Sequence, residues 1–225
     1  MKNFTLFIFF IFFSLQSYAQ TSDNTGTTFG ILGGVNFQNL NGEDSEGDKL
    51  TNEMLVGFHA GLNVQIPIAP QFYLQPGLLF STKGAKDSGT GYTSQVNLSY
   101  IELPIEFVYK GALGSGYVMI GLGPYFGYGI MGKYKLDTNL GNIESDVEFT
   151  NSIDDSSDLL KYYVKSFDAG GNIFAGYEMQ SGLFFRLNTQ LGLININPDD
   201  NRTISNDKAF VKHTGFGLSL GYRFN

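Results

Sequence analysis

Apolar and polar residues alternate along much of this 225-residue chain, and the alternation is clearest near its C-terminal end. From Leu183 to Ile194, one set of alternate positions is almost wholly apolar and the other set is mixed. After a polar break at 197–208, the alternation returns and continues to Phe224. A period of two residues indicates β-strands whose two faces meet different surroundings. Residues 183–225 are therefore predicted to form a hairpin of two long strands.

The same alternation occurs in six earlier segments, which are residues 28–40, 55–66, 72–83, 98–110, 117–131 and 166–179. Together with the final hairpin they predict eight strands, each near or above the roughly 9–11 residues that cross a bilayer when tilted. The connections alternate between long and short, and the long polar ones are 41–53, 84–95, 133–164 and 197–208. For 133–164, the alternatives to a loop are strands that extend above the membrane and a short helix. If the N-terminus is periplasmic, every long connection lies outside the cell. This pattern predicts an all-β fold, an eight-stranded antiparallel up-and-down transmembrane β-barrel.

Three prolines do not fit uninterrupted strands. Pro76, Pro104 and Pro124 lie inside three successive predicted strands. Proline has no backbone N–H to donate to a neighbouring strand, so it is normally found at edges or bulges. These positions are predicted to be bulges or strand boundaries.

The apolar set could face the interior of a soluble lipocalin-like barrel or could face lipid. The polar set consists mainly of Gly, Asn, Gln and Ser, whereas the outside of a soluble barrel should be rich in Lys and Glu. The aromatic residues of the apolar set also gather near the strand ends in two groups, as the girdles of a membrane barrel do. These groups are Phe72, Tyr109, Tyr177, Phe185, Tyr222 and Phe224 at one rim, and Phe37, Phe80, Tyr128 and Tyr134 at the other. We therefore predict that the apolar face meets lipid and that Tyr125, Phe174 and Arg186 fill a narrow interior.

The N-terminus has the three parts of a secretory signal peptide. Lys2 precedes the apolar run 4–13, and Ser17-Tyr18-Ala19 forms a small-x-small cleavage site. The apolar run is shorter than the roughly 20 residues of a membrane-spanning helix. We expect residues 1–19 to be the signal peptide and residues 20–225 to be one outer-membrane β-barrel domain.

Composition narrows the possible partners. The chain has no cysteine and a formal net charge of −7. Thiol chemistry is therefore excluded, and nucleic acid is not an expected partner because its binding needs clustered Lys and Arg. Two acidic segments, 43–48 and 154–155, lack the ligand spacing of an EF-hand, so we interpret them as solvated loops.

Several segments resemble the small outer-membrane β-barrel proteins of Bacteroidota, known as PorT-like or porin-family barrels. The similar segments are 29–36, 57–62, 74–84, 100–104, 123–125 and 220–224. The chain departs from the family pattern at Gly77, where Glu is frequent, and at Asn225, which follows the last aromatic residue. The resemblance implies an integral outer-membrane barrel, and for the founding member of the family it implies a role in protein secretion.

Charged residues on the polar face form the candidate site. Glu106 and Arg186 are predicted at similar depth in the lumen, as are Glu178 and Arg223. Eight-stranded interiors are just wide enough for side chains to fill, so salt bridges that plug the lumen are favoured over an ion or proton path. The full candidate lumenal network is Glu102, Glu106, Glu178, Arg186, Arg223, His59 and His213.

His59 and His213 are predicted to face inward near the outer mouth, both beside Asn36. A metal site would need a third ligand, which the sequence does not supply, so no metal site is assigned. A lipid hydrolase would need His and Ser together on the outer surface, within hydrogen-bond reach of each other. We therefore predict no catalytic residue and no cofactor.

The sequence predicts a non-enzymatic integral protein of the bacterial outer membrane that presents acidic extracellular loops for envelope or surface interactions. The alternatives are a narrow channel or an accessory component of a protein-secretion system, and an outer-leaflet lipid-modifying enzyme. The expected partners are outer-membrane lipid, the barrel-assembly machinery and envelope or secretion-system proteins.

Overall fold

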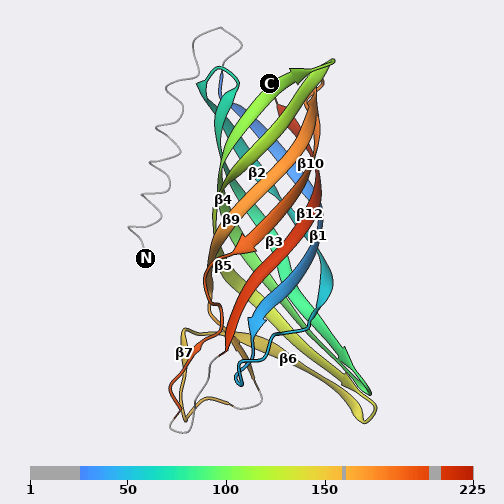
Figure 1. Ribbon diagram of the computed structural model, residues 1–225, viewed down its shortest axis with the longest axis vertical. Helices are drawn as coiled ribbons and strands as arrows, with labels where there is room; N and C mark the ends of the chain where they lie inside the picture. Colours follow the sequence, from blue (N-terminus) through green and yellow to red (C-terminus); the bar gives the residue numbers. More distant parts are fainter. Residues whose placement is uncertain (1–25, 159–160, 203–208, 225) are drawn as a thin grey trace.

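The computed structural model describes residues 26–158, 161–202 and 209–224. The expected signal peptide, residues 1–19, lies outside the described residues. Eight long strands form a ring in the order β4-β3-β2-β1-β12-β10-β9-β5, and a β4–β5 pairing completes it (Figure 1). The ring strands are β1 (Thr28–Glu43), β2 (Glu53–Ala69), β3 (Phe72–Gly89), β4 (Tyr92–Leu113), β5 (Gly116–Thr138), β9 (Phe167–Met179), β10 (Leu183–Gly192) and β12 (Phe210–Phe224). All pairings in the ring are antiparallel.

The two ends of the ring differ. At one end, short turns join β2 to β3, β4 to β5 and β9 to β10, and β12 ends there as well (Figure 1). We call this the turn end and the opposite one the loop end. The three predicted short connections are thus confirmed, and all of them lie at one end of the ring.

The predicted polar loop at 84–95 is wrong, because the strands continue through it. Strands also continue into 133–164, which was the first of the alternatives for that connection. Residues 84–95 form the ends of β3 and β4 and the tight turn between them. Residues 133–164 contain the end of β5 and three further strands, β6 (Gly141–Phe149), β7 (Ser152–Ile153) and β8 (Tyr162–Val164). The polar side chains of these hairpins obscured the strand pattern, because above the ring neither face of a hairpin is fully buried. A fourth short strand, β11 (Asp199–Asp200), pairs with β7.

An apolar cluster occupies the loop end. Its buried members are Leu40, Ala85, Val96, Leu98, Tyr100, Val147, Val164 and Ile196, and Tyr134, Phe149, Tyr162 and Val211 pack against them. Tyr134, expected in the lipid-facing girdle, is therefore part of this inner cluster, and its ring stacks on Tyr162 at 5.1 Å between centroids. The other predicted rim aromatics lie on the outward set of positions, exposed or half-buried.

The outer surface of the ring is apolar over its middle, as the alternation predicts. Outward side chains such as Phe58, Leu122 and Leu218 are about half exposed or more. Most of their inward neighbours are small, polar or aromatic, and Tyr125, Phe174 and Arg186 are all buried inside. A few inward side chains are aliphatic and pack around Phe174. In the described part of the chain, no helix has the length and apolarity required to cross a bilayer.

The three strand prolines mark neither a bulge nor a boundary. Pro76 aligns with Ile105, Pro104 with Tyr125 and Pro124 with Gly171, all inside long strands. Beside Pro76 and Pro104 two pairs are missing from the ladder, but the register resumes unchanged after each gap. The expectation of bulges was therefore wrong: these strands tolerate the lost donors without shifting.

Candidate functional site: the charged interior of the ring

Eight charged side chains are buried inside the ring, and they lie at three levels along its axis. Four are cationic and four are carboxylates, so the interior carries no net charge in the described residues. The loop level holds Lys83, Glu102 and Asp168; the middle level holds Glu106 and Arg186; and the turn level holds Lys110, Glu178 and Arg223.

The loop level is organised around Lys83, which β3 directs inward. Its Nζ lies 2.6 Å from Oε1 of Glu102 and 2.9 Å from Oδ2 of Asp168. Tyr125 donates its hydroxyl hydrogen to the same Asp168 oxygen at 3.0 Å, and its ring centroid lies 4.3 Å from Nζ of Lys83. The apolar cluster covers this level, and the Lys83 side chain has no exposed surface. The level holds one cation and two carboxylates.

The middle level contains one of the pairs predicted from the sequence. Arg186 Nη1 lies 3.1 Å from Oε2 of Glu106, which also accepts a hydrogen bond from Gln75. The Arg186 guanidinium lies 4.8 Å from the ring centroid of Phe174. The cation is therefore held inside the ring by both an acid and an aromatic side chain.

The turn level contains the second predicted pair together with an unforeseen lysine. Arg223 Nε lies 3.0 Å from Oε2 of Glu178, and Lys110 Nζ lies 2.7 Å from its Oε1. Gln75 accepts a hydrogen bond from Arg223 at 3.1 Å while donating one to Glu106, so it joins the turn and middle levels. Each oxygen of Glu178 is thus paired with a different cation.

The two histidines are both buried inside the ring but lie apart. His59 Nδ1 is 2.7 Å from Asn36 Oδ1, as the predicted position beside Asn36 requires, and its Nε2 is 2.7 Å from Ser219 Oγ. His213 instead lies at the loop level, where its Nε2 is 3.2 Å from the Tyr100 hydroxyl. The expectation that both lie beside Asn36 was wrong, because β12 positions His213 opposite Leu40, six residues further along β1 than the Gly34 that faces His59. Neither is on the outer surface, where a lipid hydrolase would need them.

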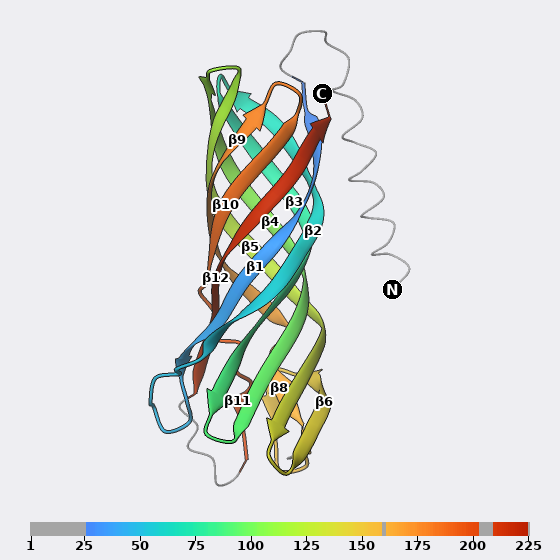
Figure 2. The ribbon, with the colours of Figure 1, turned by 90° about the vertical axis from the view of Figure 1, so that its right-hand side faces the viewer.

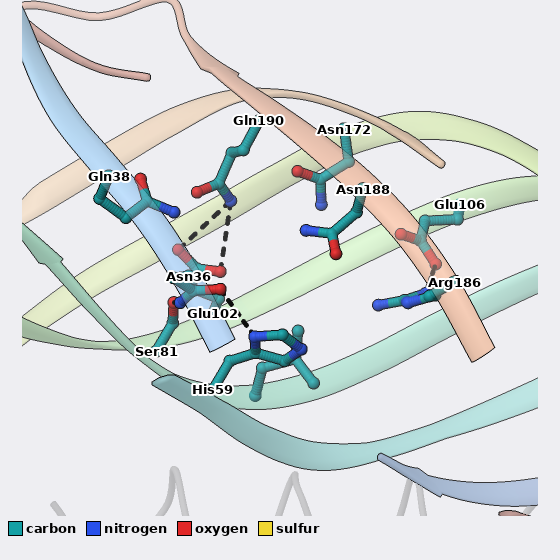
Figure 3. Close-up of a pocket in the computed structure, with 11 residues that line it drawn as sticks. Asn36, Gln38, His59, Ser81, Glu102, Glu106, Asn172, Arg186, Asn188 and Gln190 are labelled. Atoms are coloured by element: carbon teal, nitrogen blue, oxygen red, sulfur yellow. Dashed lines mark hydrogen bonds and ion pairs between the residues drawn. The ribbon is translucent and has the colours of Figure 1, made fainter. Parts of the chain in front are cut away.

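A small cavity separates the loop level from the middle level. Its volume is about 20 Å³, room for about one water molecule. Figure 3 shows the amide side chains of Asn36, Gln38, Asn172, Asn188 and Gln190 converging on it from several strands. Glu102, Glu106, His59 and Arg186 also line it. The cavity is the size of a hydration site and far smaller than a pore.

Sequence reasoning missed Lys83, Lys110 and Asp168 as members of the network. All three were on the polar face of predicted strands, so the inward direction of their side chains was available. What the sequence did not supply was the register between strands, which brings Lys83 of β3 next to Asp168 of β9 across the lumen. In the described residues, no group of three or more His, Cys, Asp or Glu side chains is placed to hold a metal ion.

Outside the ring, a second set of charges stands on the hairpin β5–β6. Lys133 Nζ lies 2.6 Å and Lys135 Nζ 3.2 Å from the two carboxylate oxygens of Glu144. Hydrogen bonds from these two lysines hold the pKa of Glu144 below its ordinary value. Glu144 is therefore negatively charged at neutral pH.

Comparison with known proteins agrees with this architecture. The chain matches the family described as "Outer membrane protein beta-barrel domain" over residues 18–197. A search of curated proteins finds no match.

Similar solved structures are remote. They include Ail, the attachment invasion locus protein of Yersinia pestis, in complex with the heparin analogue sucrose octasulfate, at 12% identity over 88% of this chain and 99% of that chain, with a TM-score of 0.38. An outer membrane channel from Pseudomonas putida F1 is 9% identical over 92% of this chain and 98% of that chain, with a TM-score of 0.32. The family match covers most of the chain, and with the apolar exterior and the charged interior of the ring it leads to one assignment: the chain belongs to the outer membrane β-barrel family and is an integral outer-membrane protein.

Proposed function

We propose that this protein is a plugged, non-enzymatic transmembrane β-barrel that presents its loop end at the cell surface for interaction with envelope or surface partners. The observation that carries the proposal is the filled interior, in which three levels of paired charges are stacked along the axis. Buried charges are stable only when paired and hydrogen-bonded, and here every one has an opposite charge within 3.1 Å. An interior filled by paired charges supports a plugged scaffold rather than a path for ions or protons.

The loop end supports the interaction role. The strands β3, β4 and β5 are 18, 22 and 23 residues long, about twice the length that a tilted strand needs to cross the bilayer. Their outer halves, with β6 and β8, form an ordered structure beyond the ring (Figure 2). Acidic residues are concentrated at the loop end as a whole, for example in the segment 43–48 between β1 and β2. Ordered, charged structure beyond the lipid is suited to binding a partner.

Export and insertion follow from the proposed location. The segment 1–19 would direct secretion and be cleaved, and the barrel-assembly machinery would insert residues 20–225 among outer-membrane lipids. A specific relation to the PorT-like barrels, and with it an accessory role in protein secretion, rests on the resemblance of strand segments alone. A channel is the weaker alternative because the cavity is about 20 Å³.

Conductance tests the plugged interior. Residues 20–225, refolded in detergent and inserted into planar bilayers, are expected to produce no regular current steps, with a general porin as the control for insertion. Discrete steps of constant size would contradict the scaffold and establish the channel.

Single-cysteine labelling tests the orientation, because the chain has no native cysteine. Leu140, fully exposed at the tip of β5–β6, and Ser115, in the turn between β4 and β5, lie at opposite ends. In intact cells, a membrane-impermeant maleimide should label Leu140→Cys and not Ser115→Cys. Labelling of Ser115→Cys alone would show that the turn end faces the medium, and this would contradict the proposed surface role of the loop end.

A further inference from the structure

The hairpin β5–β6 leaves one strand edge open beyond the ring. Strand β6 pairs with β5 from Gly141 to Asp146, and at Val147–Phe149 its other edge is covered by β8. Among the described residues, no strand pairs with that other edge along 141–146. Figure 2 shows β6 and the neighbouring hairpin β3–β4 standing beyond the loop end of the ring. An unpaired edge is a template on which another chain can add as a strand.

The pairing pattern identifies which backbone groups are available at this edge. Thr138 and Gly141 close the two-residue turn, so they form a hydrogen-bonded pair, and in an antiparallel ladder such pairs alternate with non-hydrogen-bonded ones. Ile143 and Ser145 therefore direct their N–H and C=O groups toward β5. Asn142, Glu144 and Asp146 direct theirs toward the open edge.

The side chains along the same edge of β6 favour an added strand that carries positive charge. Asn142, Glu144, Asp146 and Glu148 share the outer face of β6 and are exposed, whereas Val147, on the opposite face, is buried in the apolar cluster. On the β5 side, Lys133 and Lys135 already pair with Glu144. Cationic side chains on a strand added to the open side would extend this alternation of charge across the sheet.

The chain itself shows what such an edge accepts. Where β8 covers β6, the added segment is Lys161-Tyr162-Tyr163-Val164, and Lys161 Nζ lies 2.7 Å from Oε2 of Glu148. In this extended segment, Lys161 pairs with an acid on the outer face of β6, and Tyr162 and Val164 pack in the apolar cluster. The open part of the edge continues directly from this occupied part.

A second copy of the chain is a poor occupant. Pairing two β6 edges would place Glu144 and Asp146 of one copy beside the same acids of the other. Like charges opposite each other on neighbouring strands are destabilising. Glu144 and Asp146 therefore disfavour self-association through this edge and favour a basic partner.

We propose that residues 141–146 of β6 form a docking edge that binds an extended segment of a partner protein, with Lys or Arg at alternate positions, by strand addition. The inference rests on the proposed function, because it assumes that the loop end is accessible to partners. It adds the chemistry of the partner and the backbone groups that hold it.

Peptide binding tests the edge on the full mature chain in micelles of non-ionic detergent. The probe is a fluorescent peptide of alternating lysine and valine, and its anisotropy reports binding.

Asn142→Pro removes one edge N–H while leaving the acids and the β5 ladder in place, and proline is tolerated on edge strands. We expect it to weaken binding about tenfold, the scale of one or two lost backbone hydrogen bonds. Asp146→Asn should weaken binding at low salt and have less effect at high salt.

The matched control is Ser88→Pro, at an equivalent position of the hairpin β3–β4. Gly89 and Tyr92 close that turn, so the Ser88 N–H also points away from its partner strand, but on the opposite edge of the sheet. We expect unchanged binding, and each variant is checked for folding by the shift of its unboiled band on a gel.

Three results would overturn the proposal. They are equal binding of a peptide with the same residues in two separate blocks, equal loss of binding in Ser88→Pro and Asn142→Pro, and a dimer that Asn142→Pro dissolves. Because the peptide assay is done in micelles, its outcome is independent of conductance and of orientation in cells. Failure of the docking edge can thus be distinguished from failure of the proposed function.

Discussion

Lys83 lies between two carboxylates with no exposed side-chain surface, and its replacement measures what the loop level contributes to stability. In Lys83→Met, Glu102 and Asp168 would remain buried without their cation. Removing one partner from a buried ion pair costs about 3–5 kcal/mol, and we expect a loss of that size in the free energy of unfolding. Urea unfolding of the refolded protein in micelles measures it.

Lys86→Met is the control, because Lys86 is three residues along the same strand, is partly exposed and pairs with Glu53 at 3.4 Å. An exposed pair contributes at most about 1 kcal/mol. If the two variants unfolded at the same urea concentration, Lys83 would not be the charged centre of the loop level.

Gly121 makes room for an aromatic ring inside the barrel. A Cβ at this position would lie 2.1 Å from Cε1 of Phe174, so Gly121→Ala must displace the ring. Overpacking of this kind costs about 1–3 kcal/mol in the free energy of unfolding. Gly171→Ala, where a Cβ meets nothing within 4 Å, should change stability much less. Equal effects would mean that strand propensity, and not the packing of Phe174, determines the result.

For single residues, the sequence predicted whether a side chain points inward or outward better than it predicted which residue is its partner. The inward or outward position of nearly every strand residue followed from parity. The pairs Glu106–Arg186 and Glu178–Arg223 followed from their similar predicted depth in the lumen. The partner of Glu102 could not be predicted, because Lys83 reaches both Glu102 and Asp168 only through the stagger of three strands around the ring. The third member of the turn level, Lys110, was missed for the same reason.

Among the elements, the outer hairpins depend on contacts that the alternation did not reveal. Tyr134 of β5 stacks on Tyr162 of β8, with the planes 10° apart, and so ties β8 to the hairpin. We expect Tyr134→Ala to speed amide hydrogen exchange at Tyr162–Val164 while leaving exchange in the ring strands unchanged. Tyr92→Ala, at the exposed tip of β3–β4, is the control and should leave β8 protected. Faster exchange throughout the ring would show that the outer hairpins and the ring unfold as one unit.

The strands of the ring were predictable as elements because each has one face toward lipid, which imposes the period of two. The period of two did not locate their extensions above the ring, since at 84–95 and 133–149 both faces carry polar residues and the alternation disappears. The short pairings of β7 with β11 and of β8 with β6 join segments distant in sequence. No local pattern marks them.

For the whole molecule, the outer face must be in contact with lipid acyl chains. The chain has no tryptophan, so the fluorescence of a single introduced tryptophan reports the surroundings of that position alone. In vesicles containing brominated lipids, fluorescence of Leu122→Trp should be strongly quenched, because Leu122 is 57% exposed on the outer face of the ring. Leu140→Trp, at the tip of β5–β6, should be quenched little. The reverse order would place lipid around the loop end.

The charge balance of the interior also determines where the protein's electric field originates. Four cations and four carboxylates cancel inside the ring, and the described turn end carries no other charged side chain. Among the described residues, the loop end holds the remaining fifteen carboxylates and eight cations, so an excess of seven negative charges stands on one side of the bilayer. At physiological ionic strength that field decays over about 8 Å. A cationic molecule diffusing in the medium would therefore be attracted only within the last nanometre of its approach, and dilution of the surrounding salt would lengthen that range.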